Sequence, residues 1–203
     1  KLYQEKKYEE LIYKIENLEK IKSAQLLHIL GICKLSKKNI SNNDKLSARE
    51  DFRKAFENDK NSNLGIEALT NFINISTDFL LIDDSLKYYS EIEDKFQNNF
   101  QLLKAISRVY QFSLRTDERI KILEKITSLY PSSIDDWCSY MYINNFKKNW
   151  KQEDYYKNSK KFSQNIKITN SKKIKIDNTI MERKVRIAFF SSDINKSHSV
   201  TYF

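Results

Sequence analysis

Sets of apolar residues recur along this chain every 34 positions, and this period constrains the fold more than any other feature. In the first half of each unit the matched positions are Ile66, Phe100 and Ile134, then Leu69, Leu103 and Trp137, then Phe72, Ile106 and Tyr140. In the second half they are Leu86 and Ile120, Tyr89 and Leu123, and Ile92 and Ile126. Within each half the apolar residues stand three or four apart, which is the spacing of one helix face. The period predicts units of two helices that bury these residues against neighbouring units.

Helix start and stop signals fit this interpretation. Pro131 ends one unit, and Ser133 followed by Asp136 predicts a capped start for the next helix. Asp83 is the expected N-cap of the helix that follows it. The buried face of the helix after Ser133 is expected to be Ile134, Trp137, Cys138, Met141 and Tyr142.

A unit of this length with two helices resembles the tetratricopeptide repeat. The predicted fold is mostly α: a tetratricopeptide-like α-solenoid of antiparallel helix pairs over residues 1–163. Upstream segments fit more loosely, with helices expected at YEELIYKIENL, at LLHILGICKL and at AREDFRKAFEND, and with SKKNISNNDK as a loop insertion. Downstream, WKQEDYYKNSKKF predicts the helix of a terminal unit.

Composition supports long helices. The 203 residues include two Gly and one Pro, too few for the many turns of a β-sandwich or barrel. No apolar run is long enough to span a bilayer. Cys33 and Cys138 match no metal spacing, so they are expected to be buried thiols in a reducing cytoplasm. The chain starts at Lys1 without Met and ends at Phe203, which suggests a fragment of a longer protein.

Stacked helix pairs form grooves that bind extended peptides. Asn71, Asn74 and Asn144 are candidates to offer side-chain amides to a peptide backbone in such a groove. The alternative is that they are ordinary polar surface. His28 stands among Leu and Ile residues, which favours a core histidine over a catalytic one.

The net charge of +9 is concentrated in one segment. Residues 147–186 carry thirteen Lys or Arg against four Asp or Glu, so the preceding residues are neutral overall. A solvated helix face that continues into a charged linker is the favoured interpretation. Binding of this segment to nucleic acid or to an anionic membrane is a less favoured interpretation, because no nucleic-acid recognition motif accompanies the charge.

The last forty residues change character. Residues 164–183 are predicted to be a basic linker. VRIAFF, which begins at Val185, is apolar on both faces, as in a strand of a parallel sheet that helices cover. The loop after such a strand is where α/β sheets bind ligands. That loop contains Ser191, Ser192 and Asp193, and His198 follows it.

A strand, Ser-Ser-Asp and then His-Ser-Val with two aromatics, all after helical repeats, resembles bacterial relatives of the protein O-linked N-acetylglucosamine transferases. The resemblance makes residues 184–203 the start of a Rossmann-like catalytic lobe. It implies inverting transfer of N-acetylglucosamine from UDP-GlcNAc to Ser or Thr of a protein acceptor, with no metal or other cofactor. His198 would act as, or position, a general base, and Ser191, Ser192 and Asp193 would support the loop.

Two other readings of the chain stay open. Four residues separate Asp193 from His198, one more than in that family, so His198 could instead simply begin a helix. The whole chain could also be a non-enzymatic adaptor that binds peptides or partner proteins, because a repeat fold does not specify a reaction. The fragment alone is expected to be inactive, because the sugar-nucleotide contacts come mainly from a second lobe.

Overall fold

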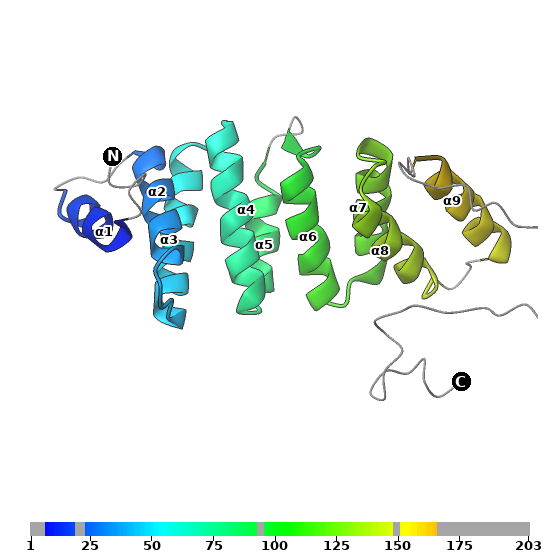
Figure 1. Cartoon of the computed structure of the whole chain (residues 1–203), viewed down its shortest axis with the longest axis horizontal. Coiled ribbons are helices and arrows are strands. Elements are labelled where there is room, and N and C mark those ends of the chain that lie inside the picture. Colours follow the sequence, from blue (N-terminus) through cyan, green and yellow to red (C-terminus); the bar gives the residue numbers. More distant parts are fainter. Residues whose placement is uncertain (1–6, 19–22, 93–95, 148–150, 166–203) are drawn as a thin grey trace, which may run out of the picture. The chain divides into compact units, whose positions relative to one another are not determined.

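The computed structural model describes residues 7–18, 23–92, 96–147 and 151–165. These residues form nine α-helices and no strand, so the predicted mostly helical fold is confirmed for them (Figure 1). In chain order the helices are α1 (Tyr8–Glu16), α2 (Ala24–Leu35), α3 (Asn42–Asn58), α4 (Asn63–Asp78), α5 (Ile82–Tyr89), α6 (Phe100–Phe112), α7 (Thr116–Leu129), α8 (Ile134–Asn144) and α9 (Gln152–Asn165). All of them belong to one compact unit, Lys1–Lys167.

The helices pack mainly on their neighbours in the chain. α2 packs on α3, α3 on α4, and α4 on both α5 and α6; further along, α7 lies between α6 and α8, and α9 contacts α8. The starts of α5 and α7, Ile82 and Thr116, are separated by one sequence period, and so are the starts of α6 and α8, Phe100 and Ile134. The period of the sequence is therefore a period of the helices over this stretch.

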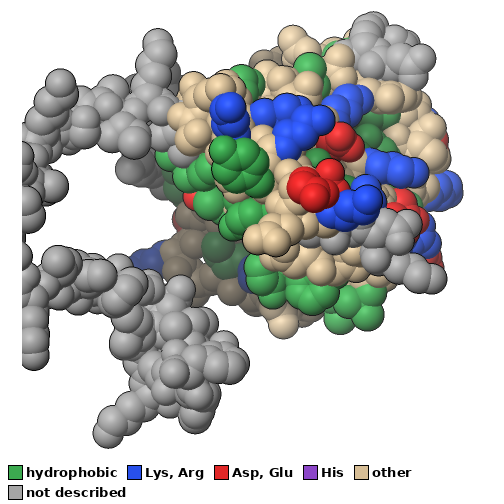
Figure 2. Space-filling model, turned by 90° about the vertical axis from the view of Figure 1, so that its right-hand side faces the viewer, with side chains coloured by type: hydrophobic (Ala, Val, Ile, Leu, Met, Phe, Trp, Pro, Cys, Tyr) green, Lys and Arg blue, Asp and Glu red, His purple; other side chains and the backbone are tan. Residues whose placement is uncertain are grey.

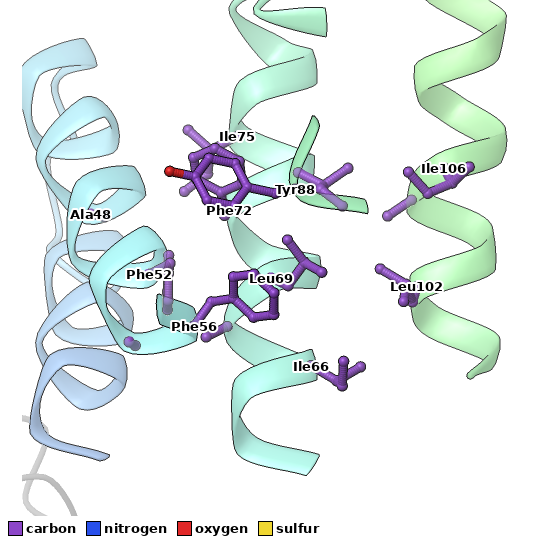
Figure 3. Packing of buried hydrophobic residues seen from close by; sticks show 14 of the residues in the cluster. Ala48, Phe52, Phe56, Ile66, Leu69, Phe72, Ile75, Tyr88, Leu102 and Ile106 are labelled. Carbon is purple, nitrogen blue, oxygen red and sulfur yellow. The ribbon is translucent and has the colours of Figure 1, made fainter. Parts of the chain in front are cut away.

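The largest apolar cluster joins α3, α4, α5 and α6, together with Leu27 of α2 (Figure 3). Figure 3 shows Phe52 and Phe56 of α3 on one side of α4, and Ile106 of α6 on the other. The ring of Phe72 in α4 meets the ring of Tyr88 in α5 edge-on, with their centroids 5.1 Å apart. Because α4 is covered from several sides, it holds more buried residues than any other described helix.

A second cluster joins α6, α7 and α8. Its buried members are Leu103, Ile120, Leu123, Ile126, Trp137, Tyr140 and Ile143. The triplet of Leu69, Leu103 and Trp137 is buried throughout, and so is the triplet of Phe72, Ile106 and Tyr140. α9 has no buried residue, and Phe162 attaches it to this cluster with its ring 5.8 Å from that of Trp137.

Both glycines mark close approaches between backbone and neighbouring atoms. A Cβ on Gly31 of α2 would lie 2.8 Å from the ring of Phe52, so the absence of a side chain lets α2 pack closely on α3. A Cβ on Gly65 would lie 1.8 Å from the backbone oxygen of Asp59. Because a backbone carbonyl cannot move aside as a side chain can, the first turn of α4 requires glycine at this position.

Two expected helix starts are wrong. α3 begins at Asn42, inside the segment that we predicted to be a loop insertion. The Ser41 hydroxyl accepts a hydrogen bond from the backbone N–H of Asp44, while the Asp44 carboxylate accepts one from the N–H of Ser41, which makes a complete capping box. α5 begins at Ile82, so Asp83 lies within its first turn and is not the N-cap; an acidic residue there still interacts favourably with the helix dipole.

The buried face of α8 also differs from the predicted stripe. Trp137 is buried as expected, but Ile134, Cys138 and Tyr142 are exposed, and Tyr140 and Ile143 are buried in their place. Ser133 is at the N-cap position as predicted, but the predicted capping box is not formed, because its side chain accepts from no backbone N–H and its hydroxyl instead donates to the carboxylate of Asp136. Both cysteines are free; Cys33 is buried as expected, whereas Cys138 is not.

Two exposed leucines adopt a left-handed backbone at equivalent places. Leu80 follows α4 with φ of 58°, and Leu114 follows α6 with φ of 56°. At each site the next residue donates a backbone hydrogen bond to the carbonyl five residues earlier, at 2.8 Å for Leu81 and 2.9 Å for Arg115. This is the bonding of a Schellman helix end, where glycine is usual because it carries no steric penalty at positive φ.

Among the described helices, none combines the length and apolar character needed to cross a membrane. The predicted linker of residues 164–183 begins later than expected, because Gln164 and Asn165 are still part of α9. The remainder of that linker and the strand predicted within residues 184–203 lie outside the described residues.

Candidate functional site

A pocket of about 440 Å³ is lined by residues of α2, of α4 and of the start of α6. We call it the amide pocket, because several of its residues carry side-chain amides. It is lined by His28, Ile32, Glu67, Thr70, Asn71, Asn74, Asn99 and Gln101. Two of the three predicted groove residues, Asn71 and Asn74, therefore lie together.

His28 forms one wall of the amide pocket and connects it to the core. The residue is buried, and its ring meets the ring of Phe52 edge-on at 5.5 Å. Its Nε2 lies 3.4 Å from Nδ2 of Asn71. Because an amide NH2 group can only donate, Nε2 is the acceptor in this contact and the proton of the neutral ring is on Nδ1. The contact holds the Asn71 amide in place.

Burial lowers the pKa of His28, and the nearby Glu67 carboxylate opposes this effect without overcoming it. The imidazole is therefore neutral at neutral pH and can keep its acceptor role. Glu67 is then the one formally charged side chain that lines the amide pocket. The pocket is suited to neutral polar groups, such as peptide bonds, more than to strongly charged ligands.

The side-chain amides of the pocket differ in how many of their hydrogen-bonding groups are already paired within the protein. Asn99 caps α6, with its Oδ1 accepting from the backbone N–H of Leu102 at 3.0 Å. Asn71 donates to His28, so its Oδ1 remains available as an acceptor. Asn74 is half-buried, and its amide has no hydrogen bond within the described part of the chain, which leaves a donor and an acceptor together. A carboxamide with both groups available can pair with the N–H and C=O of a peptide backbone.

The third predicted groove residue lies elsewhere. Asn144 is fully buried near the end of α8, and its Nδ2 donates to the backbone oxygen of Tyr140 at 2.7 Å. It therefore offers no amide to a surface ligand. The predicted catalytic residue His198 and the loop residues Ser191, Ser192 and Asp193 lie outside the described residues.

Sequence reasoning assigned His28 to the core, which is right about its burial but misses its place at the pocket. Asn99 and Gln101 were also missed. The Asn99 signal was readable, because Asn directly before a helix is a strong N-cap residue. The packing of α4 on both α2 and α6, which brings these residues to one pocket, has no local sequence signal.

The described part of the basic segment is not a continuous cationic surface. Figure 2 views the end that carries α9; Lys and Arg side chains gather on its upper part, with Asp and Glu among them and hydrophobic side chains beside them. Within α9, Glu153 and Asp154 accompany the lysines. Across the described ranges, no cluster of His, Cys, Asp and Glu could hold a metal ion.

The chain matches no known family model and no curated protein.

Proposed function

We propose that the helices form a tetratricopeptide-like solenoid that binds an extended protein segment through the amide pocket. The observation that carries this proposal is the positioned pair of His28 and Asn71 beside the half-buried amide of Asn74. Holding one amide in place reduces the conformational entropy that a ligand must remove on binding. Peptide backbones present alternating donors and acceptors that such amides satisfy.

The regular offset between helix starts, one sequence period from α5 to α7 and from α6 to α8, supports the repeat part of the proposal. Helix pairs stacked at this period expose the same positions of successive helices along one surface, and such surfaces bind extended chains in repeat proteins. His28, Asn71 and Gln101 come from α2, α4 and the start of α6, so the amide pocket spans three neighbouring elements of this kind.

Binding to short synthetic peptides of diverse sequence tests the proposal. Peptides that bind the wild-type chain should bind Asn71→Ala and Asn74→Ala about tenfold more weakly, because each loses a hydrogen bond to the ligand. Asn145→Ala is the matched control, since Asn145 is exposed and does not line the pocket. Equal affinities for all four proteins would rule out the amide pocket as the peptide site.

The sequence at residues 184–203 favours a more specific role for the same binding surface. We propose that the helices deliver a protein acceptor to a transferase related to the O-linked N-acetylglucosamine transferases, which would use UDP-GlcNAc and a base at His198. The gene sequence beyond the codon for Phe203 tests this role. It should encode roughly 300–400 further residues, the size of two α/β lobes.

If those lobes are present, His198→Ala in the complete protein should abolish sugar transfer while peptide binding through the amide pocket stays unchanged. If they are absent, the protein is a peptide-binding adaptor and the transferase proposal fails. Either role fits the cytoplasm, because Cys33 and the exposed Cys138 are unpaired thiols, which persist in reducing compartments.

A further inference from the structure

A second pocket, of about 330 Å³, lies between α6 and α8 over α7. We call it the cationic pocket, because three of its lining side chains are basic and one is acidic. It is lined by Lys104, Ser107, Arg108, Gln111, Phe112, Arg119, Leu123, Asp136 and Ser139. α6 and α8 each pack on α7, so the pocket is bounded by three helices that contact one another in sequence.

Arg119 of α7 is the unusual member of the cationic pocket. Its guanidinium has no hydrogen bond and no ion pair within the described residues, and its Nε atom is fully buried without a partner. Burial lowers the pKa of Arg119, and no neighbouring carboxylate opposes the effect. A partly buried cation without a counter-charge costs folding free energy, so the helices alone do not explain its presence.

The other two cations are partly neutralised. Arg108 Nη2 lies 2.5 Å from the carboxylate of Asp78, and this pair is well exposed to solvent. Lys104 Nζ lies 3.7 Å from the carboxylate of Asp136, which also accepts a hydrogen bond from Ser133. Asp136 is thus engaged by two groups, and Arg119 remains the cation that an incoming anion would satisfy.

The equivalent position in the preceding unit holds a different type of residue from Arg119. The position one period before Arg119 is Ser85, a fully buried serine whose hydroxyl donates to the backbone oxygen of Leu81. The unit that carries the amide pocket therefore has a small, satisfied residue where the next unit has a large unpaired cation. The scaffold accepts a small residue here, so it does not itself require a cation.

We propose that the cationic pocket binds an oxyanion carried by a peptide, a carboxylate or a phosphoryl group, with Arg119 donating from α7 and Lys104 and Arg108 adding positive charge from α6. The planar guanidinium presents parallel donors that match two oxygens of either group. The hydroxyls of Ser107 and Ser139 lie in the same pocket and add neutral donors. That the anion is carried by a peptide rests on the proposed function; the anion site itself does not.

A packing role is the alternative for Arg119. Its methylene groups could cover Leu123 while the charge simply reaches toward water. Arg119→Met separates the two roles, because methionine keeps an unbranched apolar side chain and removes the charge. Arg119→Lys keeps the charge and removes the planar pair of donors.

The first experiment uses inorganic phosphate and N-acetylglutamate as free probes. Saturable shifts of the backbone amide NMR signals of Ser107 and Ser139 are expected at constant ionic strength set with chloride. Affinity should fall about tenfold or more in Arg119→Met and less in Arg119→Lys, because a charge-assisted hydrogen bond is lost. Arg115→Gln, on an exposed arginine of the same region outside the pocket, should leave both affinities unchanged.

The second experiment compares peptides that are identical except for one central residue: Glu, phosphoserine or Gln. Tighter binding of the Glu or the phosphoserine peptide, lost in Arg119→Met, supports the proposal and identifies the anion. If Arg119→Met binds the free anions as tightly as the wild type, the anion site does not exist. If the free anions bind but none of the peptides does, the peptide-binding function fails, and with it the peptide part of this proposal.

Discussion

The amide pocket and the cationic pocket share two lining positions of the repeat, on α4 and on α6, and differ in charge. Thr70 and Asn74 of α4 line the first, and Lys104 and Arg108 of α6, one period later, line the second. Between the same two units the core positions stay apolar and buried, as with Phe72 and Ile106. The comparison shows that the fold restricts the inward positions of each helix, while the positions on the open face can take different chemistry.

The two pockets also differ in how their central polar group is satisfied. In the amide pocket, Asn71 is paired with a neutral histidine that burial keeps deprotonated. In the cationic pocket, Arg119 has no partner within the described residues. A satisfied group positions a ligand at little cost to the free fold, whereas an unsatisfied one lowers stability until a ligand arrives.

The largest expected effect on stability comes from a substitution in α4, the helix that contributes most residues to the amide pocket. Gly65→Ala places a Cβ against the backbone oxygen of Asp59, so α4 cannot start where it does, and we expect a loss of about 2 kcal/mol or more in the free energy of unfolding. Urea denaturation measures this. Asn63→Ala, in the same turn but exposed, is the control and should cost much less. If both variants lost the same small amount of unfolding free energy, position 65 would not lie close to the backbone oxygen of Asp59.

The next largest effect is an increase in stability, and it concerns Arg119 of the cationic pocket. Arg119→Met should raise the free energy of unfolding by about 1 kcal/mol, because it removes a partly buried charge that lacks a partner. Thermal denaturation at low phosphate concentration measures it. Arg108→Met, which removes an exposed cation that is paired with Asp78, should bring no such gain. A loss of stability in Arg119→Met would mean that the guanidinium has a favourable contact in the fold.

A pH effect sharpens the contrast between the pockets. Burial lowers the pKa of His28 below its ordinary value of about 6.5, so the unfolded chain binds a proton more readily than the folded one. The contribution of the neutral His28 to the free energy of unfolding is therefore fully present above about pH 6.5. It is lost progressively as the pH falls from there through the folded-state pKa.

Urea denaturation of the wild type and of His28→Gln across this range isolates the contribution. The variant should show a flatter dependence as the pH falls below about 6.5. Peptides bound at the amide pocket should also dissociate more readily at the lower pH, because a protonated His28 no longer accepts from Asn71. An identical pH dependence in both proteins would show that His28 does not change its protonation on unfolding.

The smallest effect concerns the helix ends that follow α4 and α6. Leu114→Gly should raise the free energy of unfolding by about 0.5 kcal/mol, since relief of the left-handed backbone strain exceeds the extra entropy of glycine in the unfolded chain. Leu80→Gly should do the same at the equivalent site. Leu129→Gly, at the end of α7 and within the helix, is the control and should destabilise. Thermal denaturation compares the three.

The repeat period predicted buried positions better than local signals did, although Ile134, which both of them placed in the core, is exposed. The repeat period correctly predicted that Trp137 and Tyr140 are buried, because it compares positions that pack alike in successive units. The local stripe was also wrong for Cys138 and Tyr142, because a short helix with apolar residues all round does not reveal which face a neighbour covers. The start of α3 was missed although Ser41 and Asp44 form a readable capping box.

The candidate sites were harder to predict than the helices. Asn71 and Asn74 could be proposed because their side-chain amides can bind a peptide backbone in the groove of stacked helix pairs, but a single sequence does not show that Asn144 is buried. The environment of Arg119 depends on three helices at once, and nothing in its local sequence indicates a missing partner. The residues of the predicted catalytic loop, His198 among them, stay predictions.

The equal spacing of the helix starts has a consequence for how such a gene can change. Residues 82–115 make up one full period, so an in-frame deletion of that stretch joins α4 to α7 at the point where α4 now leads into α5. By the repeat offset, Arg119 would then stand at the position of Ser85 on the helix after α4, and Thr70 and Asn74 would hold the positions of Lys104 and Arg108. A single recombination between units would thus bring a guanidinium and an amide, which now belong to different units, into the same unit.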